Sequence, residues 1–166
     1  MKYLSLIFWF MATILVSCNS AITDDSVTRI DNSEVVLGHQ HDQTSSKDSL
    51  VAFPEGAEVF FVNLQDGQVV KPNFKVEMGI KGMEVRPAGE VLYGTGHHHI
   101  IVNGPFYEPG QIIPKDSLNI HFGGGETETE LNLKPGVYEL TLQFANGAHM
   151  SFGKVLSKTI KIEVKN

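Results

Sequence analysis

The chain has 166 residues, of which 42% are hydrophobic, enough for one ordinary domain with a buried core. Its 13 basic residues against 19 acidic ones give a formal net charge of −6. This balance, with no cluster of Lys and Arg, excludes nucleic acid as the expected partner, and a single cysteine excludes an internal disulfide.

Residues 1–17 have the pattern of a bacterial lipoprotein signal peptide. Lys2 gives a positive start, and the apolar run over 4–16 is too short to span a bilayer comfortably. The run ends in Leu15-Val16-Ser17-Cys18, which resembles a lipobox, where cleavage precedes a cysteine that is then lipidated. We therefore expect a lipid on Cys18 to anchor the chain to a membrane of the bacterial cell envelope, on an extracytoplasmic face. An ordinary secretory signal is the alternative.

Residues 18–53 are expected to comprise the lipidated cysteine and a flexible polar tether. The segment is rich in Ser, Thr, Asp, Asn and Gln, and residues 40–49 are almost wholly polar. Such a composition buries too little apolar surface to offset the chain entropy lost on folding. His39 and His41 lie in this tether, where an accessory metal-capturing role is the alternative to their being incidental surface residues.

Residues 54–166 are expected to form the folded domain, an all-β, antiparallel β-sandwich of immunoglobulin-like type with about seven strands. Short segments rich in β-branched and aromatic residues are separated by Gly and Pro residues typical of turns, and several of them alternate apolar and polar side chains. No amphipathic helix is apparent. Tyr138 after the Pro135-Gly136 turn is similar to the tyrosine corner of such domains. The expected strands cover residues 57–63, 73–80, 97–103, 118–122, 126–133, 137–144 and 157–164, with a loop over 81–90.

Three consecutive histidines stand at the start of the third expected strand. Because side chains alternate along a strand, His97 and His99 share one face, and His98 points to the other. This His-x-His spacing can hold one metal ion, and His121 and His149 are candidates for further ligands.

The identity of the metal depends on which other side chains join the imidazoles. The thioether of Met150, beside the last histidine, or of Met83 would favour copper. A carboxylate would favour zinc. The sequence therefore predicts copper or zinc without deciding between them.

The segment after His121 could support such a site. Gly123, Gly124 and Gly125 allow a sharp turn or a close approach of the backbone to a ligand. The alternating Glu126, Glu128 and Glu130 could orient ligands from outside, although a solvated strand face is the simpler interpretation.

Two alternatives to a metal-binding domain remain open at this stage. In one, His97, His99 and His121 form a metal-free hydrogen-bond network with Thr127 or Thr129, in a structural or protein-interaction domain. In the other, a metal-dependent hydrolase or oxidoreductase would use Glu126 as its base. No Gly-x-Ser-x-Gly elbow, phosphate loop or cysteine outside the lipobox supports catalysis, so a binding role is favoured and an enzymatic one is left undecided.

Several short blocks occur in an order and spacing that resemble a known family. They are Gly82-Met83, Pro87-Ala88-Gly89, Gly96-His97-His98-His99, Ile113-Pro114, His121-Phe122-Gly123-Gly124-Gly125-Glu126-Thr127-Glu128 and Leu133-Lys134-Pro135-Gly136. Over roughly residues 57–165 the chain closely resembles domain-of-unknown-function family 4399, a family of secreted or periplasmic bacterial domains. The resemblance implies an extracytoplasmic setting and no particular activity.

Overall fold

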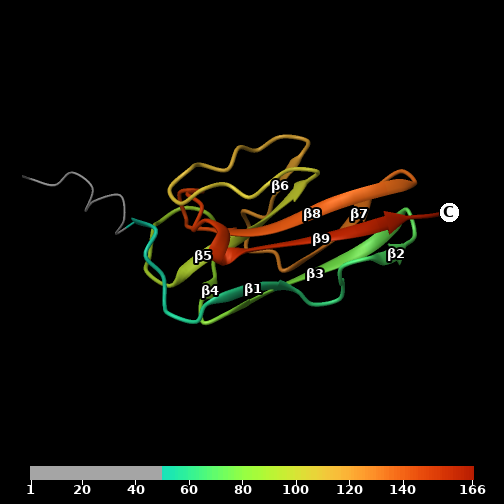
Figure 1. Ribbon diagram of the computed structural model, residues 1–166. Coiled ribbons are helices and arrows are strands. Elements are labelled where there is room, and N and C mark those ends of the chain that lie inside the picture. Colours follow the sequence, from blue (N-terminus) through green and yellow to red (C-terminus); the bar gives the residue numbers. More distant parts are fainter. Residues whose placement is uncertain (1–49) are drawn as a thin grey trace, which may run out of the picture. The chain divides into compact units, whose positions relative to one another are not determined.

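The computed structural model describes residues 50–166. The expected signal peptide, Cys18, His39, His41 and most of the expected tether lie outside the described residues and stay predictions. The regular secondary structure of the described part is almost entirely strand (Figure 1). They are β1 (Glu58–Phe61), β2 (Gln68–Val70), β3 (Asn73–Lys81), β4 (Glu84–Val85), β5 (Thr95–Val102), β6 (Asn119–His121), β7 (Glu128–Asn132), β8 (Gly136–Ala145) and β9 (Ser157–Val164), with a 3-10 turn at Lys154–Leu156 before β9.

All seven expected strands are present, and two short ones are additional. Strand β2 forms in residues for which no element was expected, and β4 forms inside the expected loop over 81–90. Both are only two or three residues long, too short to carry a recognisable alternation. Both also pair in parallel, β2 with β9 and β4 with β5.

The strands form two sheets. The smaller sheet has the order β1-β3-β7, and the larger has the order β2-β9-β8-β5-β4, with β6 also pairing with β5. Apart from the two short parallel pairs, the pairing within both sheets is antiparallel. The all-β sandwich expected from the sequence is therefore confirmed, with parallel additions at the two ends of the larger sheet.

The hydrophobic core lies between the sheets and follows the alternation of the strands. Val76 and Met78 of β3 contribute from one side, and Leu140, Leu142 and Phe144 of β8 from the other, each 3% exposed or less. The hydroxyl of Tyr138 donates to the backbone carbonyl of Lys134 at 3.0 Å, which is the bond of a tyrosine corner.

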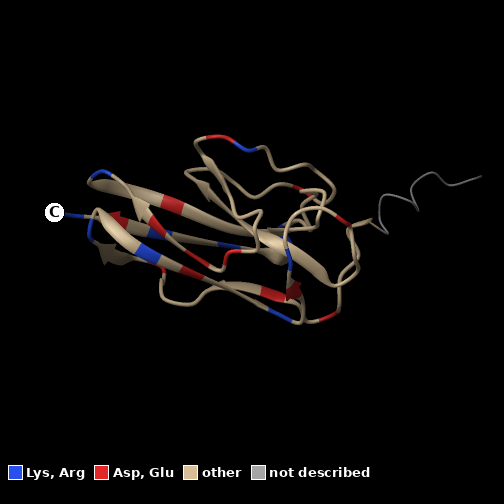
Figure 2. Ribbon diagram, turned by 180° about the vertical axis from the view of Figure 1, so that it is seen from behind, with Lys and Arg blue, Asp and Glu red and all other residues tan. Residues whose placement is uncertain are grey.

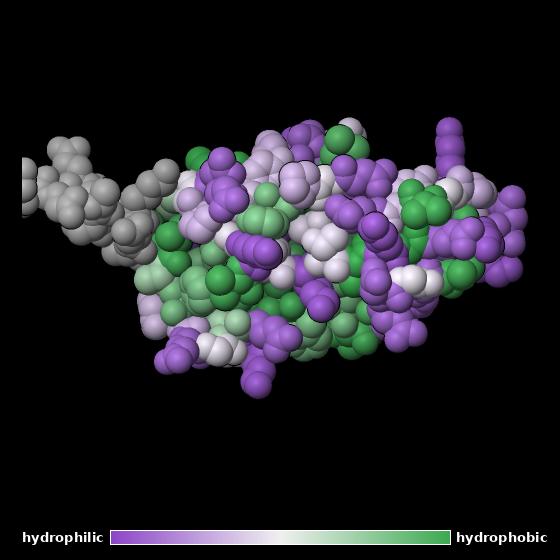
Figure 3. All heavy atoms as spheres, viewed as in Figure 1, coloured by the Kyte–Doolittle hydropathy of each residue, from purple (hydrophilic) through white to green (hydrophobic). Residues whose placement is uncertain are grey.

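The outer surface is mixed in character. Figure 3 shows hydrophilic and hydrophobic residues interspersed over one face, and Figure 2 shows the positions of basic and acidic residues spread along strands and loops. Glu126, Glu128 and Glu130 are exposed, and Glu128 pairs with Lys75 at 2.9 Å. Glu128 and Glu130 therefore lie on a solvated strand face, the simpler interpretation, whereas Glu126 precedes β7 and lies near His121. Among residues 50–166, no helix has the length and hydropathy needed to cross a membrane.

Strand β5 is the best-protected element of the larger sheet. Every one of its eight residues is buried, because β8 pairs along one side and β4 and β6 along the other. One face, with Ile100, joins the core between the sheets. The opposite face lies beneath the loops around Tyr107 and Ser151, which both hydrogen-bond to Gln143 across from His99.

Candidate metal centre

The register of β5 decides which histidines meet. His99 is paired with His121 of β6 on one side and with Gln143 of β8 on the other, and His97 is paired with Ala145. Directly paired residues of an antiparallel ladder project to the same face of the sheet. His121 therefore returns to the face that carries His97 and His99, and the small side chain of Ala145 leaves room beside His97.

His149 reaches this face from a turn after β8. Residues 146–150 form the turn, which is closed by an antiparallel bridge between Ala145 and Ser151. The side-chain oxygen of Asn146 accepts hydrogen bonds from the backbone amides of Ala148 and Met150, both at 3.0 Å. His149 has a φ of 64°, in the left-handed region that residues with a Cβ adopt infrequently.

These four side chains, His97, His99, His121 and His149, form one group that we call the histidine cluster. Its six ring pairs have centroids 4.7–6.0 Å apart. The Nε2 atoms of His97 and His99 are 3.1 Å apart, and those of His121 and His149 are 3.0 Å apart. One ring nitrogen from each of His97, His99 and His121 lies within 4.8 Å of the others, so these three could hold a metal ion.

Burial keeps His97, His99 and His121 in the neutral form that a metal requires. His97 and His99 are fully buried, whereas His121 and His149 are half-buried. Burial, with the neighbouring histidines, lowers the pKa of His97 to about 4 and that of His99 to about 2. Burial and the nearby His149 also lower the pKa of His121. These imidazoles are therefore neutral at pH 7, with a lone pair available for coordination.

The cluster is poorly satisfied as a hydrogen-bond network. Among the described residues, no partner reaches the Nδ1 atoms of His97 and His99. Thr127 and Thr129, the network partners suggested by the sequence, make no side-chain hydrogen bond to the cluster. Thr129 pairs with Val76 in the smaller sheet, and the carbonyl of Thr127, just before β7, accepts from the amide of Met78. The network containing these threonines is therefore wrong, and the only side-chain bonds of the described histidines run between histidines.

The glycine run after His121 packs closely against the cluster. A Cβ on Gly123 would overlap the His121 ring. The amide of Gly124 donates to the exposed Glu126 carboxylate at 3.0 Å, and Gly125 has a left-handed φ of 85°. Glu126 lies near enough to offset part of the lowering of the His121 pKa.

The two methionines considered as soft ligands have other roles. Met83 packs against the hydrophobic core. Met150 contributes its backbone amide to the turn that carries His149. The four imidazoles are therefore the donors that the described contacts bring together, and a thioether contribution from Met150 stays a prediction.

His98 is a core residue, as the strand period predicts. It is fully buried, and its ring lies 5.0 Å from that of Phe144 in an edge-on arrangement. Neither ring nitrogen has a hydrogen-bond partner among the described residues, and burial lowers its pKa to about 4.

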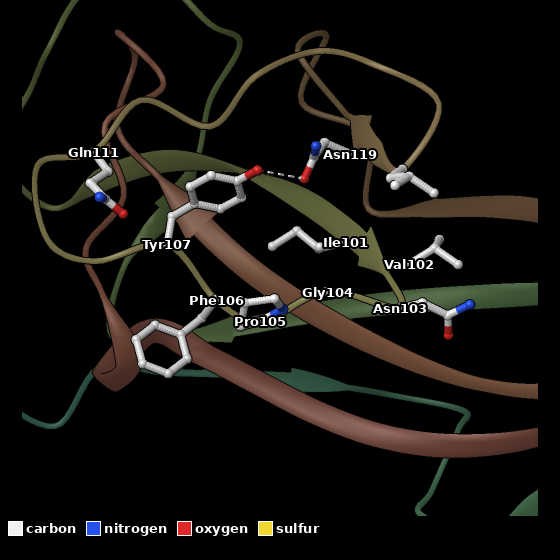
Figure 4. Close-up of a pocket in the computed structure, with 10 residues that line it drawn as sticks. Ile101, Val102, Asn103, Gly104, Pro105, Phe106, Tyr107, Gln111 and Asn119 are labelled. Carbon is white, nitrogen blue, oxygen red and sulfur yellow. Dashed lines mark hydrogen bonds between the residues drawn. The ribbon is translucent and has the colours of Figure 1, made fainter.

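A separate cavity of about 300 Å³ lies beside the end of β5, on the face that carries His97 and His99. Its lining includes Ile101, Tyr107 and Asn119, and the Tyr107 hydroxyl donates to Asn119 at 3.2 Å (Figure 4). None of the histidines lines it.

The part that Asn146 plays in placing His149 is not visible in the sequence. The Asn146-Gly147 pair was recognisable as a turn signal at the end of a strand, but its side-chain bonds, including one of 2.8 Å from Nδ2 to the carbonyl of Leu50, depend on the tertiary structure.

Comparison with solved structures gives a partial match. The chain is similar over 66% of its length to 20% of the endo-beta-1,4-mannanase from Thermotoga petrophila, with 19% identity and a TM-score of 0.39. It thus spans about a fifth of that chain. No curated protein matches the sequence.

The family comparison gives the wider match. The model of a domain of unknown function, DUF4399, covers residues 76–165, which is more than half of the 166 residues and includes all four members of the histidine cluster. The chain therefore belongs to the DUF4399 family.

Proposed function

We propose that this chain binds one divalent transition-metal ion, copper or zinc, through His97, His99, His121 and His149. The observation that carries the proposal is the pairing of Nε2 atoms at 3.1 Å and 3.0 Å. Two nitrogens about 2.0–2.1 Å from one ion lie roughly 2.9 Å apart at a right angle and roughly 3.35 Å apart at a tetrahedral angle. These two separations fall between the two values, and one ring nitrogen from each of His97, His99 and His121 lies within 4.8 Å of the others.

The cluster carries an energetic cost that its own hydrogen bonds do not offset. A buried polar group without a partner costs about 1–3 kcal/mol, and Nδ1 of both His97 and His99 is in this state. A structural network is expected to satisfy its members. An ion bound at Nε2 would leave these Nδ1 atoms unpaired, so the coordinate bonds themselves would have to offset this cost.

The all-imidazole donor set favours zinc or copper(II) over copper(I), which prefers thioether and thiolate ligands. With His149 added to His97, His99 and His121, four ligands would complete a tetrahedral shell and leave no open position for a substrate or a water nucleophile. Glu126, the residue considered as a base, is exposed and bonded to the amide of Gly124. These features support a binding role over a metal-dependent hydrolase or oxidoreductase.

The decisive experiment is a titration of chelator-treated protein with Zn(II) and with Cu(II), followed by calorimetry. We expect about one ion per chain in the wild type and the loss of that binding in His99→Ala. The matched control is His98→Leu, on the same strand but the opposite face, which should retain binding. No binding of either ion by the folded wild type would instead favour a structural or protein-interaction domain.

We also propose that the domain works at the bacterial cell envelope, held to a membrane by a lipid on Cys18. The support is the lipobox-like Leu15-Val16-Ser17-Cys18 at the end of an apolar run. Expression of the full chain in a bacterium and mass spectrometry of the product should find diacylation at Cys18. The Cys18→Ser variant should leave the membrane fraction, and unchanged membrane association of that variant would contradict the anchor.

A further inference from the structure

The short segment Arg86–Glu90, which follows β4, touches all three parts of the chain that carry the cluster. The amide of Arg86 donates to the carbonyl of Gly96, next to His97, at 2.7 Å. The amide of Ala88 donates to the carbonyl of Gly123 at 2.9 Å, in the glycine loop after His121. The amide of Gly89 donates to the carbonyl of Gly147 at 2.9 Å, in the turn that carries His149.

The hydrogen-bond acceptors that meet this segment belong to glycines, and at Gly147 the contact is too close for a side chain. A Cβ on Gly147 would overlap the carbonyl oxygen of Glu90. A Cβ on Gly125 would lie 3.4 Å from the backbone nitrogen of Pro87, at a residue whose φ is already left-handed. Two ligand-bearing loops therefore pack directly onto the backbone of one segment.

This arrangement matters because the loops are far apart in sequence. His121 and His149 are 28 residues apart, and their Nε2 atoms nevertheless lie 3.0 Å from each other. A shift of either loop by a few tenths of an ångström would change that distance directly. The amide of Ala88 bonds to the loop after His121, and the next amide, that of Gly89, bonds to the turn that carries His149. The segment with these amides follows β4, which pairs with β5.

We infer that Ala88 and Gly89 are positioning residues of the metal centre, which set its affinity by holding His121 and His149 at coordinating distance without contacting the ion. The inference rests on the proposed metal binding. It also explains why β4, only two residues long, is paired with the start of β5: this pairing places the segment against both loops.

The test uses Gly147→Ala, which displaces the turn from the segment while leaving every ligand in place. The control is Gly79→Ala in the smaller sheet, where the added Cβ would meet only the side chain of Phe60. The dissociation constant for Zn(II) should rise about 10-fold or more in Gly147→Ala and stay within about twofold in Gly79→Ala, with both variants folded by circular dichroism. Ala88→Pro, which removes the amide donor to Gly123, should weaken binding similarly.

A double-mutant cycle distinguishes positioning from general destabilisation. In a His149→Ala background, Gly147→Ala should change the dissociation constant by less than about twofold, because the ligand through which it acts is gone. If Gly147→Ala weakens Zn(II) affinity by the same factor with and without His149, the inference is overturned while metal binding stands. Unchanged Zn(II) affinity in Gly147→Ala and Ala88→Pro would have the same consequence. Absence of binding by the wild type would overturn the proposed function, and this inference with it.

Discussion

His99 of β5 and His121 of β6 face each other directly across an antiparallel pair, with ring centroids 5.1 Å apart and an interplanar angle of 34°. They are 22 residues apart in the sequence. The chain between them forms a loop that lines the cavity beside Ile101. This pairing turns a two-histidine strand motif into a site with three convergent imidazoles.

Two neighbouring glycines provide a sharp test of the His121 position. A Cβ on Gly123 would overlap the His121 ring, whereas a Cβ on Gly124 would meet only the exposed carboxylate of Glu126. We expect Gly123→Ala to weaken Zn(II) binding about 10-fold or more and Gly124→Ala to change it little, as measured by competition with a chromophoric chelator. Equal affinities in the two variants would show that the His121 ring does not take part.

The buried His98 predicts an unusual result for a core substitution. Its two ring nitrogens have no partner, so the folded state carries the cost of burying them. Because leucine has a similar volume and no polar atoms, His98→Leu should leave the free energy of unfolding at pH 7 unchanged or raise it by about 1–2 kcal/mol. Urea denaturation measures this difference. A loss of more than about 2 kcal/mol would mean that His98 makes a stabilising polar contact.

Acid should destabilise the metal-free protein between pH 6.5 and 4. The pKa of His97 and of His98 is lowered from 6.5 to about 4, and that of His99 to about 2. Above pH 6.5 these groups are neutral in both states; below it the unfolded chain takes up protons that the folded chain does not. Each such histidine lowers the free energy of unfolding by up to about 1.4 kcal/mol per pH unit.

The measurement for this prediction is urea unfolding of chelator-treated protein at several pH values. Comparison with His98→Leu isolates one histidine, since that variant should lose stability less steeply as the pH falls. Parallel pH profiles for the two proteins would contradict the lowered pKa of His98.

Metal should stabilise the fold reversibly. An ion present at about 100 times its dissociation constant adds about 2.7 kcal/mol to the free energy of unfolding, which corresponds to a rise of several degrees in Tm for a domain of this size. Differential scanning calorimetry should show this rise with Zn(II) or Cu(II) and its removal by chelator. His121→Ala should show neither change, and a metal-induced rise of wild-type size in that variant would place the ion elsewhere.

Much of the architecture could be read from local pattern. Alternation along Asn73–Ile80 and Val137–Phe144 predicted strands that are now β3 and β8, and the same period separated His97 and His99 from His98. Strands β2 and β4 could not be predicted in this way, because two or three residues carry no period and their pairing partners are distant in sequence. The position of His149 beside His121 could not be predicted either, because in the sequence it looks like an exposed loop residue.

By itself, the sequence determined the β class of the domain, the faces on which the strand histidines lie, and the glycines that allow close approach, because these follow from side-chain alternation and backbone sterics within a few residues. The tertiary structure decided that His121 comes back beside His99, that His149 joins it, and that Arg86–Glu90 holds both loops. Those outcomes depend on strand register and loop closure across tens of residues, where many pairings satisfy the same local pattern.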